Sequence, residues 1–195
     1  MNKKKNKLTY ADAGVDIDAM EDSLGRIKKD VMSTFNSMVI KNVGGFGTLH
    51  EIPAEDEREQ VLISSIDGVG TKMMVARKMQ KYDTVGQDLI NHCVNDILTL
   101  GARPLYFLDY VGTESLEPEV MEQIVSGLAT GCRENNLALL GGETAEMPGV
   151  YVKGESDLVG CITGIANRGS LITGRDIKKG DSIIGLGSSG LHTNG

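Results

Sequence analysis

The chain has 195 residues, of which 20 are basic and 27 acidic, so its formal charge is −7. A net-acidic chain is a poor nucleic-acid binder, because such proteins present a basic surface. Its 40% hydrophobic and 24% charged content is typical of a folded globular protein and excludes disorder. No apolar run approaches the roughly 18 residues that span a bilayer, so we expect no membrane segment. Glycine is unusually frequent, at 25 residues, and predicts many tight turns and close backbone approaches.

The cysteines and the N-terminus indicate the compartment. Cys93, Cys132 and Cys161 are odd in number, widely spaced and set among apolar neighbours, which predicts buried, reduced thiols. The basic residues 1–7 are followed by polar residues and not by an apolar core, so they do not form a secretory signal. We therefore expect a cytoplasmic protein.

The first half of the chain predicts a helix followed by a strand. Residues 21–36 carry Leu24, Ile27, Val31 and Phe35 at helical spacing, with Asp18 or Asp22 as the cap. A glycine-rich segment at 43–47 and a charged loop at 55–59 come next. The apolar, β-branched run 61–66 predicts a strand, and it breaks into a tight turn, Asp-Gly-Val-Gly-Thr-Lys, at 67–72. Ligand sites commonly form where such strands end.

The remaining pattern alternates helices with strands. We expect helices at 71–79, 84–100 and 118–135, and strands at 105–111, 138–140, 158–165 and 182–186. This alternation predicts an α/β or α+β fold. The last strand leads into a polar glycine loop with no helix after it. We therefore expect a fragment, or a chain without its second domain.

One helix face carries acids and amides without cations. In the helix at 83–100, the apolar residues share one side: Leu89, Ile90, Cys93, Val94, Ile97 and Leu98. The polar residues share the other: Asp88, Asn91, His92, Asn95 and Asp96. No basic residue lies between Lys81 and Arg103, so this face is suited to receive a cation such as Mg²⁺. The alternative is that these residues cap and hydrogen-bond neighbouring loops, and His92 is expected to be a hydrogen-bond partner and not a ligand.

Carboxylates near strand ends extend this candidate site. Asp67, Asp109 and Glu143 each lie at or near the end of a predicted strand and, with Asp96, are expected to converge on one sheet edge. Mg²⁺ takes one or two carboxylates and completes its shell with phosphate oxygens and water, which indicates a nucleoside triphosphate.

The turn at 67–72 adds candidate phosphate contacts. Its backbone N–H groups at a helix N-terminus attract phosphate, and Lys72 supplies a positive charge. The spacing is neither that of a P-loop nor that of a dinucleotide fingerprint. A purely structural turn is therefore the alternative. Near the C-terminus, His192 stands in a Gly-Ser-Ser-Gly-Leu-His-Thr-Asn-Gly loop, where a general acid, a general base or a phosphate contact fits.

These motifs together resemble the phosphoribosylformylglycinamidine cyclo-ligase family, the aminoimidazole ribonucleotide synthetases. The resemblance rests on segments in family order: 10–16, 44–47, 67–72, 94–96, 107–110, 141–149 and 188–195. The run Gly-Gly-Glu-Thr-Ala-Glu-Met-Pro-Gly at 141–149 is specific to this family. Asp96 to Pro104 resembles the Asp-x4-Gly-Ala-x-Pro signature of a wider ATP-binding superfamily, which includes thiamine-monophosphate kinase and selenophosphate synthetase.

The resemblance implies an ATP-dependent ring closure in purine biosynthesis. ATP phosphorylates the amide oxygen of formylglycinamidine ribonucleotide, and the amidine nitrogen then displaces phosphate to form aminoimidazole ribonucleotide. The implied Mg²⁺ ligands are Asp67 and Asp96, followed by Asp109 and Glu143. Lys72 and His192 are the implied catalytic residues. The implied ATP or substrate contacts are Gly44, Gly45, Gly47, Asp67, Gly68, Gly70, Thr71, Lys72, Asp96, Thr144 and Asn194.

The resemblance also implies a mixed sheet flanked by helices, which pairs with its copy to close a barrel in a homodimer. Residues 1–169 would form the N-terminal ATP-binding and dimerisation domain, and 170–195 the first strand and loop of a second α/β domain. Two other functions stay open: a related ATP-dependent phosphotransferase, and a non-catalytic nucleotide-binding or dimerisation module.

Overall fold

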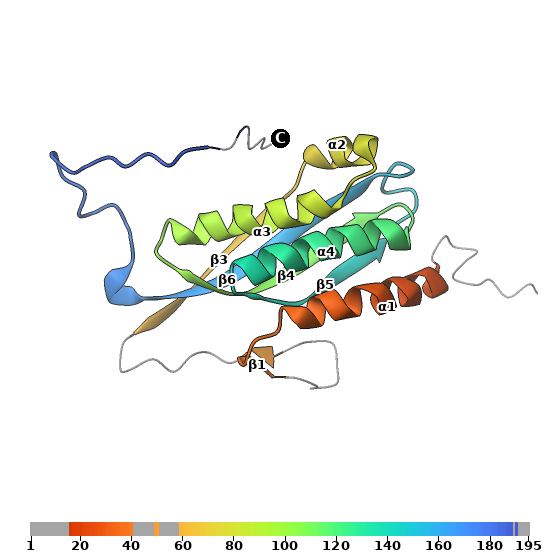
Figure 1. Cartoon of the computed structure of the whole chain (residues 1–195), viewed down its shortest axis with the longest axis horizontal. Helices are drawn as coiled ribbons and strands as arrows, with labels where there is room; N and C mark the ends of the chain where they lie inside the picture. The colour runs from red at the N-terminus through yellow and green to blue at the C-terminus, as the bar shows by residue number, and fades with distance from the viewer. Residues whose placement is uncertain (1–15, 41–48, 51–58, 189, 191–195) are drawn as a thin grey trace, which may run out of the picture.

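The computed structural model describes residues 16–40, 49–50, 59–188 and 190 (Figure 1). The predicted contacts Gly44, Gly45, Gly47, His192 and Asn194 lie outside the described residues. Within the described ranges, no helix combines the length and the apolar character that crossing a membrane requires.

A mixed four-stranded sheet forms one layer of the molecule, and helices form the other. The helices are α1 (Ile17–Ser33), α2 (Lys72–Met79), α3 (Asp83–Leu98) and α4 (Pro118–Glu134), with a short 3-10 helix at Arg168–Ser170. The sheet strands are β3 (Gln60–Gly68), β4 (Arg103–Thr113), β5 (Ala138–Glu146) and β6 (Ser156–Asn167), in the order β3-β6-β4-β5. β1 (Val39–Ile40) and β2 (Leu49–His50) form a separate pair.

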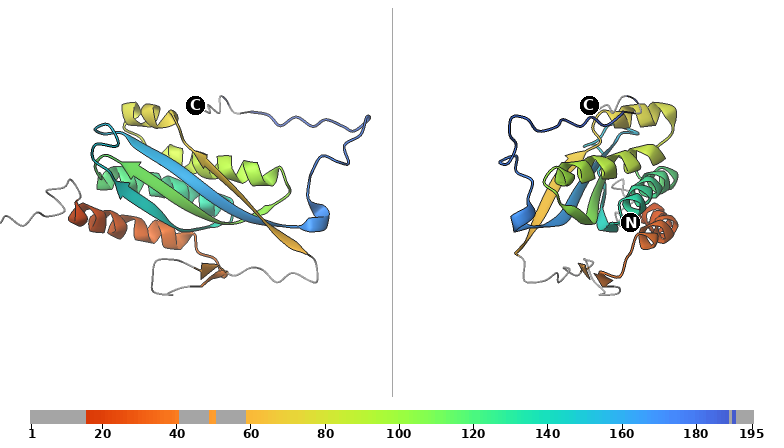
Figure 2. Two further views of the ribbon diagram at one scale, coloured as in Figure 1. Left: turned by 180° about the vertical axis from the view of Figure 1, so that it is seen from behind. Right: turned by 60° about the vertical axis from the view of Figure 1, so that its left-hand side comes forward.

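Strand directions place three strand ends on one edge. β6 runs antiparallel to β3 and β4, and β5 is parallel to β4, so β3, β4 and β5 all point the same way. Helices α1, α3 and α4 cover one face of the sheet, and the view from behind shows the other face without a helix (Figures 1 and 2). The predicted class, a mixed sheet with flanking helices, is confirmed.

The core lies between α3, α4 and the sheet. Its largest fully buried side chains include Phe107, Leu89, Ile90, Ile97, Leu128 and Ile162. Gly160 of β6 leaves room for the Phe107 ring, because a Cβ at this glycine would stand 2.0 Å from the ring Cζ. Full burial of such side chains contributes roughly 1.5–3 kcal/mol each.

Helices α3 and α4 approach so closely that only glycine fits between them. A Cβ on Gly127 would lie 1.9 Å from the carbonyl oxygen of Asp83, and one on Gly86 would lie 2.4 Å from that of Ile124. Each glycine thus admits the backbone of the opposite helix. Part of the high glycine content is explained by this contact and not by ligand binding.

Helix α1 begins earlier than predicted and uses a different cap. Asp16, and neither Asp18 nor Asp22, accepts the N–H of Ala19 at 3.0 Å. Leu24 is also not in the buried stripe, because 54% of it is exposed.

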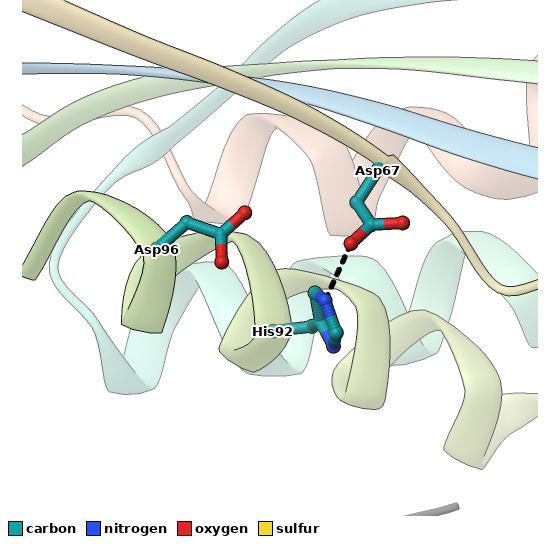
Figure 3. A group of neighbouring side chains, drawn as sticks. All are labelled: Asp67, His92 and Asp96. Atoms are coloured by element: carbon teal, nitrogen blue, oxygen red, sulfur yellow. Dashed lines mark ion pairs between the residues drawn. The ribbon is translucent and has the colours of Figure 1, made fainter. Parts of the chain in front are cut away.

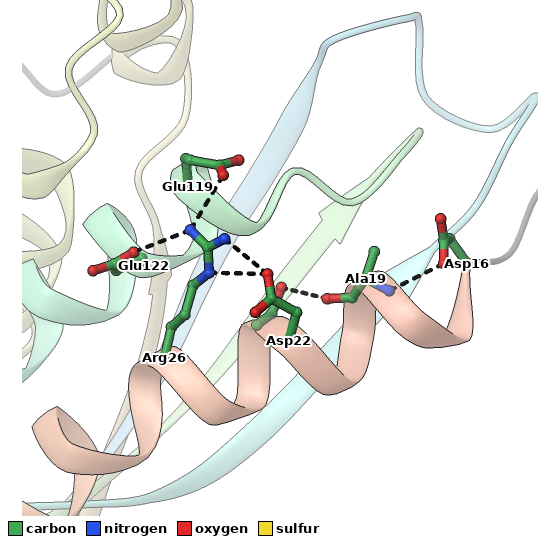
Figure 4. A network of polar contacts seen from close by, with 7 residues as sticks. Asp16, Ala19, Asp22, Arg26, Glu119 and Glu122 are labelled. Carbon is green, nitrogen blue, oxygen red and sulfur yellow. Dashed lines mark hydrogen bonds and ion pairs between the residues drawn. The ribbon is translucent and has the colours of Figure 1, made fainter.

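An Arg26 network joins α1 to α4. Arg26 pairs with Asp22 at 2.8 Å and reaches Glu119 and Glu122 of α4 at 3.2 and 3.5 Å (Figure 4). Asp22, and to a smaller extent Glu119, raise the pKa of Arg26, although its own desolvation opposes them. Because the group is at the surface, its main effect is to orient α1 on α4.

Two strand predictions are wrong. β5 does not end at Leu140 but continues through Gly141 and Gly142 to Glu146, with a register shift opposite Phe107 and Leu108. Residues 182–186 do not form a strand, and Ile183 and Leu186 are 100% and 94% exposed. A strand needs a neighbouring strand for its backbone hydrogen bonds, and the described part of the chain places none beside this segment.

Candidate functional site

Helix α3 has the two faces that its sequence predicts. Leu89, Ile90, Cys93 and Ile97 are at most 1% exposed and pack into the core. Only Leu98 departs from the expected apolar side, with 57% of it exposed at the end of the helix. The opposite, polar face of α3 is therefore available for a site.

Asp67, His92 and Asp96 form a compact group beside the carboxyl end of β3. Each offers one ligand atom, and all three atoms lie within 4.8 Å of one another. The His92 Nε2 lies 2.5 Å from the Asp67 Oδ2, and their side chains are 23% and 39% exposed. Figure 3 shows His92 and Asp96 rising from successive turns of α3 toward Asp67. The structure therefore brings together the two leading predicted metal ligands.

Neighbouring groups orient both carboxylates. The backbone N–H of Gly68 donates to Asp67 Oδ1 at 2.7 Å, and the Ser65 hydroxyl donates to Asp96 Oδ2 at 2.6 Å. Asp67 Oδ2 pairs with His92 Nε2 and would bind a ligand in place of that contact, whereas Asp96 Oδ1 has no partner among the described residues. Two carboxylate oxygens fit a divalent cation that completes its shell with phosphate oxygens and water.

Sequence reasoning named His92 and missed Ser65 at this site. His92 is predicted to be a hydrogen-bond partner, and its contact with Asp67 confirms this. Its spacing of four residues from Asp96 was a usable signal. Ser65 carried no such signal, because only the packing of α3 on β3 brings it to Asp96.

Asp109 and Glu143 lie outside this group. Neither is at a strand end, because both are within the paired parts of β4 and β5. Asp109 is on the helix-covered face, between the buried Phe107 and Val111. Glu143 pairs with Tyr110 and is therefore on the opposite face. The predicted convergence of all four carboxylates on one edge is wrong. Asp67 of β3 and Asp109 of β4 are nevertheless both paired with Gly160 of β6, so these two residues lie in the same row across the sheet.

Gly142 makes space for the Asp109 carboxyl group. A Cβ at Gly142 would lie 2.5 Å from Asp109 Oδ1, so a side chain there would displace the carboxyl. Desolvation raises the pKa of Asp109 to about 7. Thr144, a predicted substrate contact, is half-buried two residues further along β5, opposite Val111.

This raised pKa predicts how stability depends on pH. The pKa of Asp109 is about 7 in the folded chain and 3.8 ordinarily, so the folded state holds the proton more tightly. Its contribution to the free energy of unfolding is complete below about pH 4 and is lost as pH rises toward about 7. We expect Asp109→Asn to flatten this decline, as measured by urea unfolding across that range. Parallel pH profiles for the parent and the variant would contradict the assignment.

The turn after β3 supplies fewer phosphate donors than its sequence suggests. Gly68 N–H is held by Asp67, and Val69 N–H donates to Leu158 O at 2.8 Å. Gly70 has a φ of +66°, which favours glycine, and opens the turn toward α2. Within the described residues, the N–H groups of Gly70 and Thr71 have no internal acceptor. Those two remain candidates for an anion.

Lys72 is ion-paired with Asp88 of α3. Both residues line an open groove between α2 and α3, together with Met79, Asn91 and Asn95. Asp88 holds the ammonium group of Lys72, the predicted phosphate contact, in place. Asp88 lies one helical turn before His92 on α3.

Two of the three thiols are buried in the core. Cys93 and Cys132 are fully buried, as predicted, whereas Cys161 is half-buried. Burial, with the nearby charges of Asp67 and Asp96, raises the pKa of Cys93 to about 12. Such a thiol stays protonated and serves as a core side chain.

The fold has solved relatives. Thiamine-monophosphate kinase from Stenotrophomonas maltophilia K279a matches 76% of this chain and 43% of its own, with a TM-score of 0.58 and 18% identity. HypE from E. coli matches 71% of this chain and 41% of its own, with a TM-score of 0.50 and 20% identity. These likenesses show the fold alone. Together with the site, they define an α/β protein that carries a carboxylate–imidazole group where a sheet strand ends.

Sequence comparison then gives the family. Residues 49–166 match the model of "AIR synthase related protein, N-terminal domain". The chain belongs to this family. It is 52% identical over 189 residues to the phosphoribosylformylglycinamidine cyclo-ligase of Alkaliphilus oremlandii (strain OhILAs), and 50% identical to that of Carboxydothermus hydrogenoformans.

The match covers 97% of this chain and 55% of each relative, so the chain spans about half the length of these relatives. The resemblance recognised from the motifs is confirmed.

Proposed function

We propose that the chain is the N-terminal part of an ATP-dependent cyclo-ligase that converts formylglycinamidine ribonucleotide to aminoimidazole ribonucleotide in purine biosynthesis. The observation that carries this proposal is the 50–52% identity, over 97% of the chain, to relatives named phosphoribosylformylglycinamidine cyclo-ligase. The relatives extend well beyond the matched region, so the activity is proposed for the protein of which this chain is a part. A cytoplasmic location is part of the proposal.

The proposed reaction activates an amide oxygen and then closes a ring. The amide oxygen is a poor leaving group until it receives the γ-phosphoryl group of ATP; the amidine nitrogen then attacks the same carbon, and phosphate leaves. Positioning and charge neutralisation carry most of the catalysis in phosphoryl transfer. The chain must therefore hold a triphosphate in line with the amide oxygen.

The described residues divide these tasks. Asp67 and Asp96 would hold Mg²⁺, which neutralises charge on the triphosphate when bound. Gly68 and Ser65 fix the two carboxylates in advance. Gly70 and Thr71 offer backbone N–H groups to phosphate, and Lys72 offers a positive charge from the same turn. Residues 1–169 would form the ATP-binding domain, and 170–195 would lead into the next domain.

The test is an assay of both products. The purified protein is mixed with ATP, Mg²⁺ and formylglycinamidine ribonucleotide, and ADP and the aminoimidazole are followed together. We expect equal amounts of both. ADP released in response to substrate without any imidazole would contradict ring closure and favour a related phosphotransferase. ATP binding without turnover would favour a nucleotide-binding module.

We also propose that two copies pair through the sheet face that carries no helix. Ile66, Cys161 and Leu108 lie in register across β3, β6 and β4 and share this face. Ile66 is 70% exposed and Leu108 41%, and Leu62 on the same face is 55% exposed. Exposed apolar rows of this kind commonly mark interfaces. A second copy, related by a two-fold axis, would cover this row.

A charge in this row should dissociate the dimer. We expect Ile66→Glu to raise the dimer dissociation constant at least about tenfold, because two carboxylates would be buried at the interface. Sedimentation equilibrium measures this change. Leu24→Glu on α1 places the same charge on an exposed apolar residue of the other layer, and it should leave the dimer intact. A parent protein that is monomeric at high concentration would contradict the pairing.

A further inference from the structure

Arg77 fastens the loop between β5 and β6 to helix α2. Its Nη2 donates to the carbonyl oxygen of Lys153 at 3.0 Å, and its Nη1 lies 3.5 Å from the Glu155 Oε1. Within the described residues, no other side chain of α2 hydrogen-bonds to residues 147–155. Helix α2 and this loop lie together at the end of the sheet where β3, β4 and β5 finish (Figures 1 and 2). One side chain therefore connects the loop to the helix that follows the turn at 67–72.

Gly154 makes this contact possible. Its φ of +72° is a backbone conformation that favours glycine, and a Cβ there would lie 3.1 Å from the Arg77 Nη2. The tight turn at Gly154 directs the Lys153 carbonyl and the Glu155 carboxylate to the same guanidinium group. On its other side, the loop is held by the segment that follows β4, because Glu114 N–H donates to the Glu155 carbonyl oxygen at 3.4 Å. The last part of the loop is therefore fixed between that segment and α2.

An open cavity of about 540 Å³ lies between this loop and the turn that follows β3. The turn, the loop and α2 all line it, through Gly70, Thr71, Arg77, Lys78 and residues 154–156. Its volume is within the range of small-ligand sites. The N–H groups of Gly70 and Thr71, which are the proposed phosphate contacts, have no acceptor within the described residues. A shift of the loop away from α2 would therefore change the width of the cavity beside those two groups.

We propose that Arg77 is a positioning residue of the triphosphate site: by holding residues 153–155 on α2, it sets the width of the cavity beside the Gly70 and Thr71 N–H groups. This role rests on the proposed function, because that function assigns phosphate to the turn after β3. The Arg77 side chain is 44% exposed, and an exposed ion pair adds little to the stability of a fold. Loss of Arg77 is therefore expected to change ligand binding and not folding.

Calorimetric titration with ATP in the presence of Mg²⁺ measures this role. We expect Arg77→Met, which keeps an unbranched side chain but removes the guanidinium group, to raise the ATP dissociation constant about three- to thirtyfold. The midpoint of urea unfolding should stay unchanged. Hydrogen exchange should become faster at the Glu155 amide, which donates to the Val152 carbonyl oxygen at 2.8 Å, because the loop opens more often. Parental ATP affinity in Arg77→Met, or a parent chain that binds no ATP, would overturn the inference.

Two further variants show which property of Arg77 matters. Lys78→Met removes the same charge from the next residue of α2, which lines the cavity but is not hydrogen-bonded to the loop within the described residues. It should bind ATP like the parent. Arg77→Lys keeps the charge and one group that can reach the loop, so it should recover part of the lost affinity. Equal weakening by Lys78→Met and Arg77→Met would indicate a general effect of positive charge and contradict the positioning role.

The competing role for Arg77 is direct contact with the triphosphate. Glu155→Ala separates the two roles, because it removes one partner of the guanidinium group and leaves Arg77 itself in place. If Arg77 acts through the loop, ATP binding should weaken, although a negative charge has been removed from the cavity. The double variant should then bind no more weakly than Arg77→Met alone. Tighter ATP binding by Glu155→Ala would indicate a guanidinium group released to bind phosphate and would overturn the positioning role.

The binding measurement does not depend on ring closure. Weakened ATP binding by Arg77→Met, in a protein that forms no aminoimidazole, would support the role of Arg77 and contradict the proposed function. Parental ATP binding by Arg77→Met, in a protein that does form aminoimidazole, would do the reverse.

Discussion

Asp96→Asn is expected to weaken Mg²⁺-dependent ATP binding by about tenfold or more while leaving the fold intact. The substitution removes one of the two anionic oxygens that would hold the ion, and loss of a ligand or its support typically costs 10–100-fold in metal affinity. Asp96 is exposed, and an asparagine oxygen can still accept the Ser65 hydroxyl. We therefore expect the free energy of unfolding to change by no more than about 0.5 kcal/mol.

Calorimetric titration with ATP, in the presence of Mg²⁺ and again with a chelator, measures this effect. Asp83→Asn is the matched control, because Asp83 is an exposed carboxylate on the same helix, at its N-terminal end. It should bind ATP like the parent. An Asp96→Asn protein with parental affinity would remove Asp96 from the site.

Gly127→Ala is expected to lower the free energy of unfolding by about 3 kcal/mol or more. Its new Cβ would stand 1.9 Å from the carbonyl oxygen of Asp83, where the obstacle is helix backbone and not a flexible side chain. The two helices would have to separate, and overpacking of this kind costs about 1–3 kcal/mol and occasionally more. Urea unfolding measures the change.

Gly25→Ala is the control that isolates this contact. Gly25 is also inside a helix, α1, but a Cβ there meets nothing within 4 Å. Alanine should stabilise that helix by about 0.5–1 kcal/mol through its higher helix propensity. Opposite signs for the two substitutions are the expected result. Similar small effects would contradict the close approach of α3 and α4.

The local spacing of apolar and polar residues predicted most of the fold, because this spacing indicates directly which side chains are buried. The alternation of buried and exposed side chains in β3 and the two faces of α3 both follow from which side chains are apolar. The structure confirms both. Asp16 was missed as the cap of α1, because Asp18 and Asp22 offer the same chemistry two and six residues later. Only the point at which the helix begins distinguishes them.

The structural role of the glycines in β5 was the hardest feature to predict from the sequence. Gly141 and Gly142 were interpreted as the end of a strand, since glycine disfavours strands. Gly142 is instead required inside β5, because the Asp109 carboxyl of the neighbouring strand occupies the place of a side chain. The pairing of β4 with β5 across the intervening helix α4 decides this, and no local pattern reports it.

The sequence by itself determined the family, the class of fold, the polar face of α3 and the pairing of Asp67 with Asp96 as candidate ligands. These follow from motif order and from helical and strand periodicity, which are local properties. The tertiary structure alone decided that His92 and Ser65 join that pair, while Asp109 and Glu143 do not. The physical reason is that sheet register and helix packing set which strand residue faces which helical turn, and both depend on contacts between segments far apart in the chain.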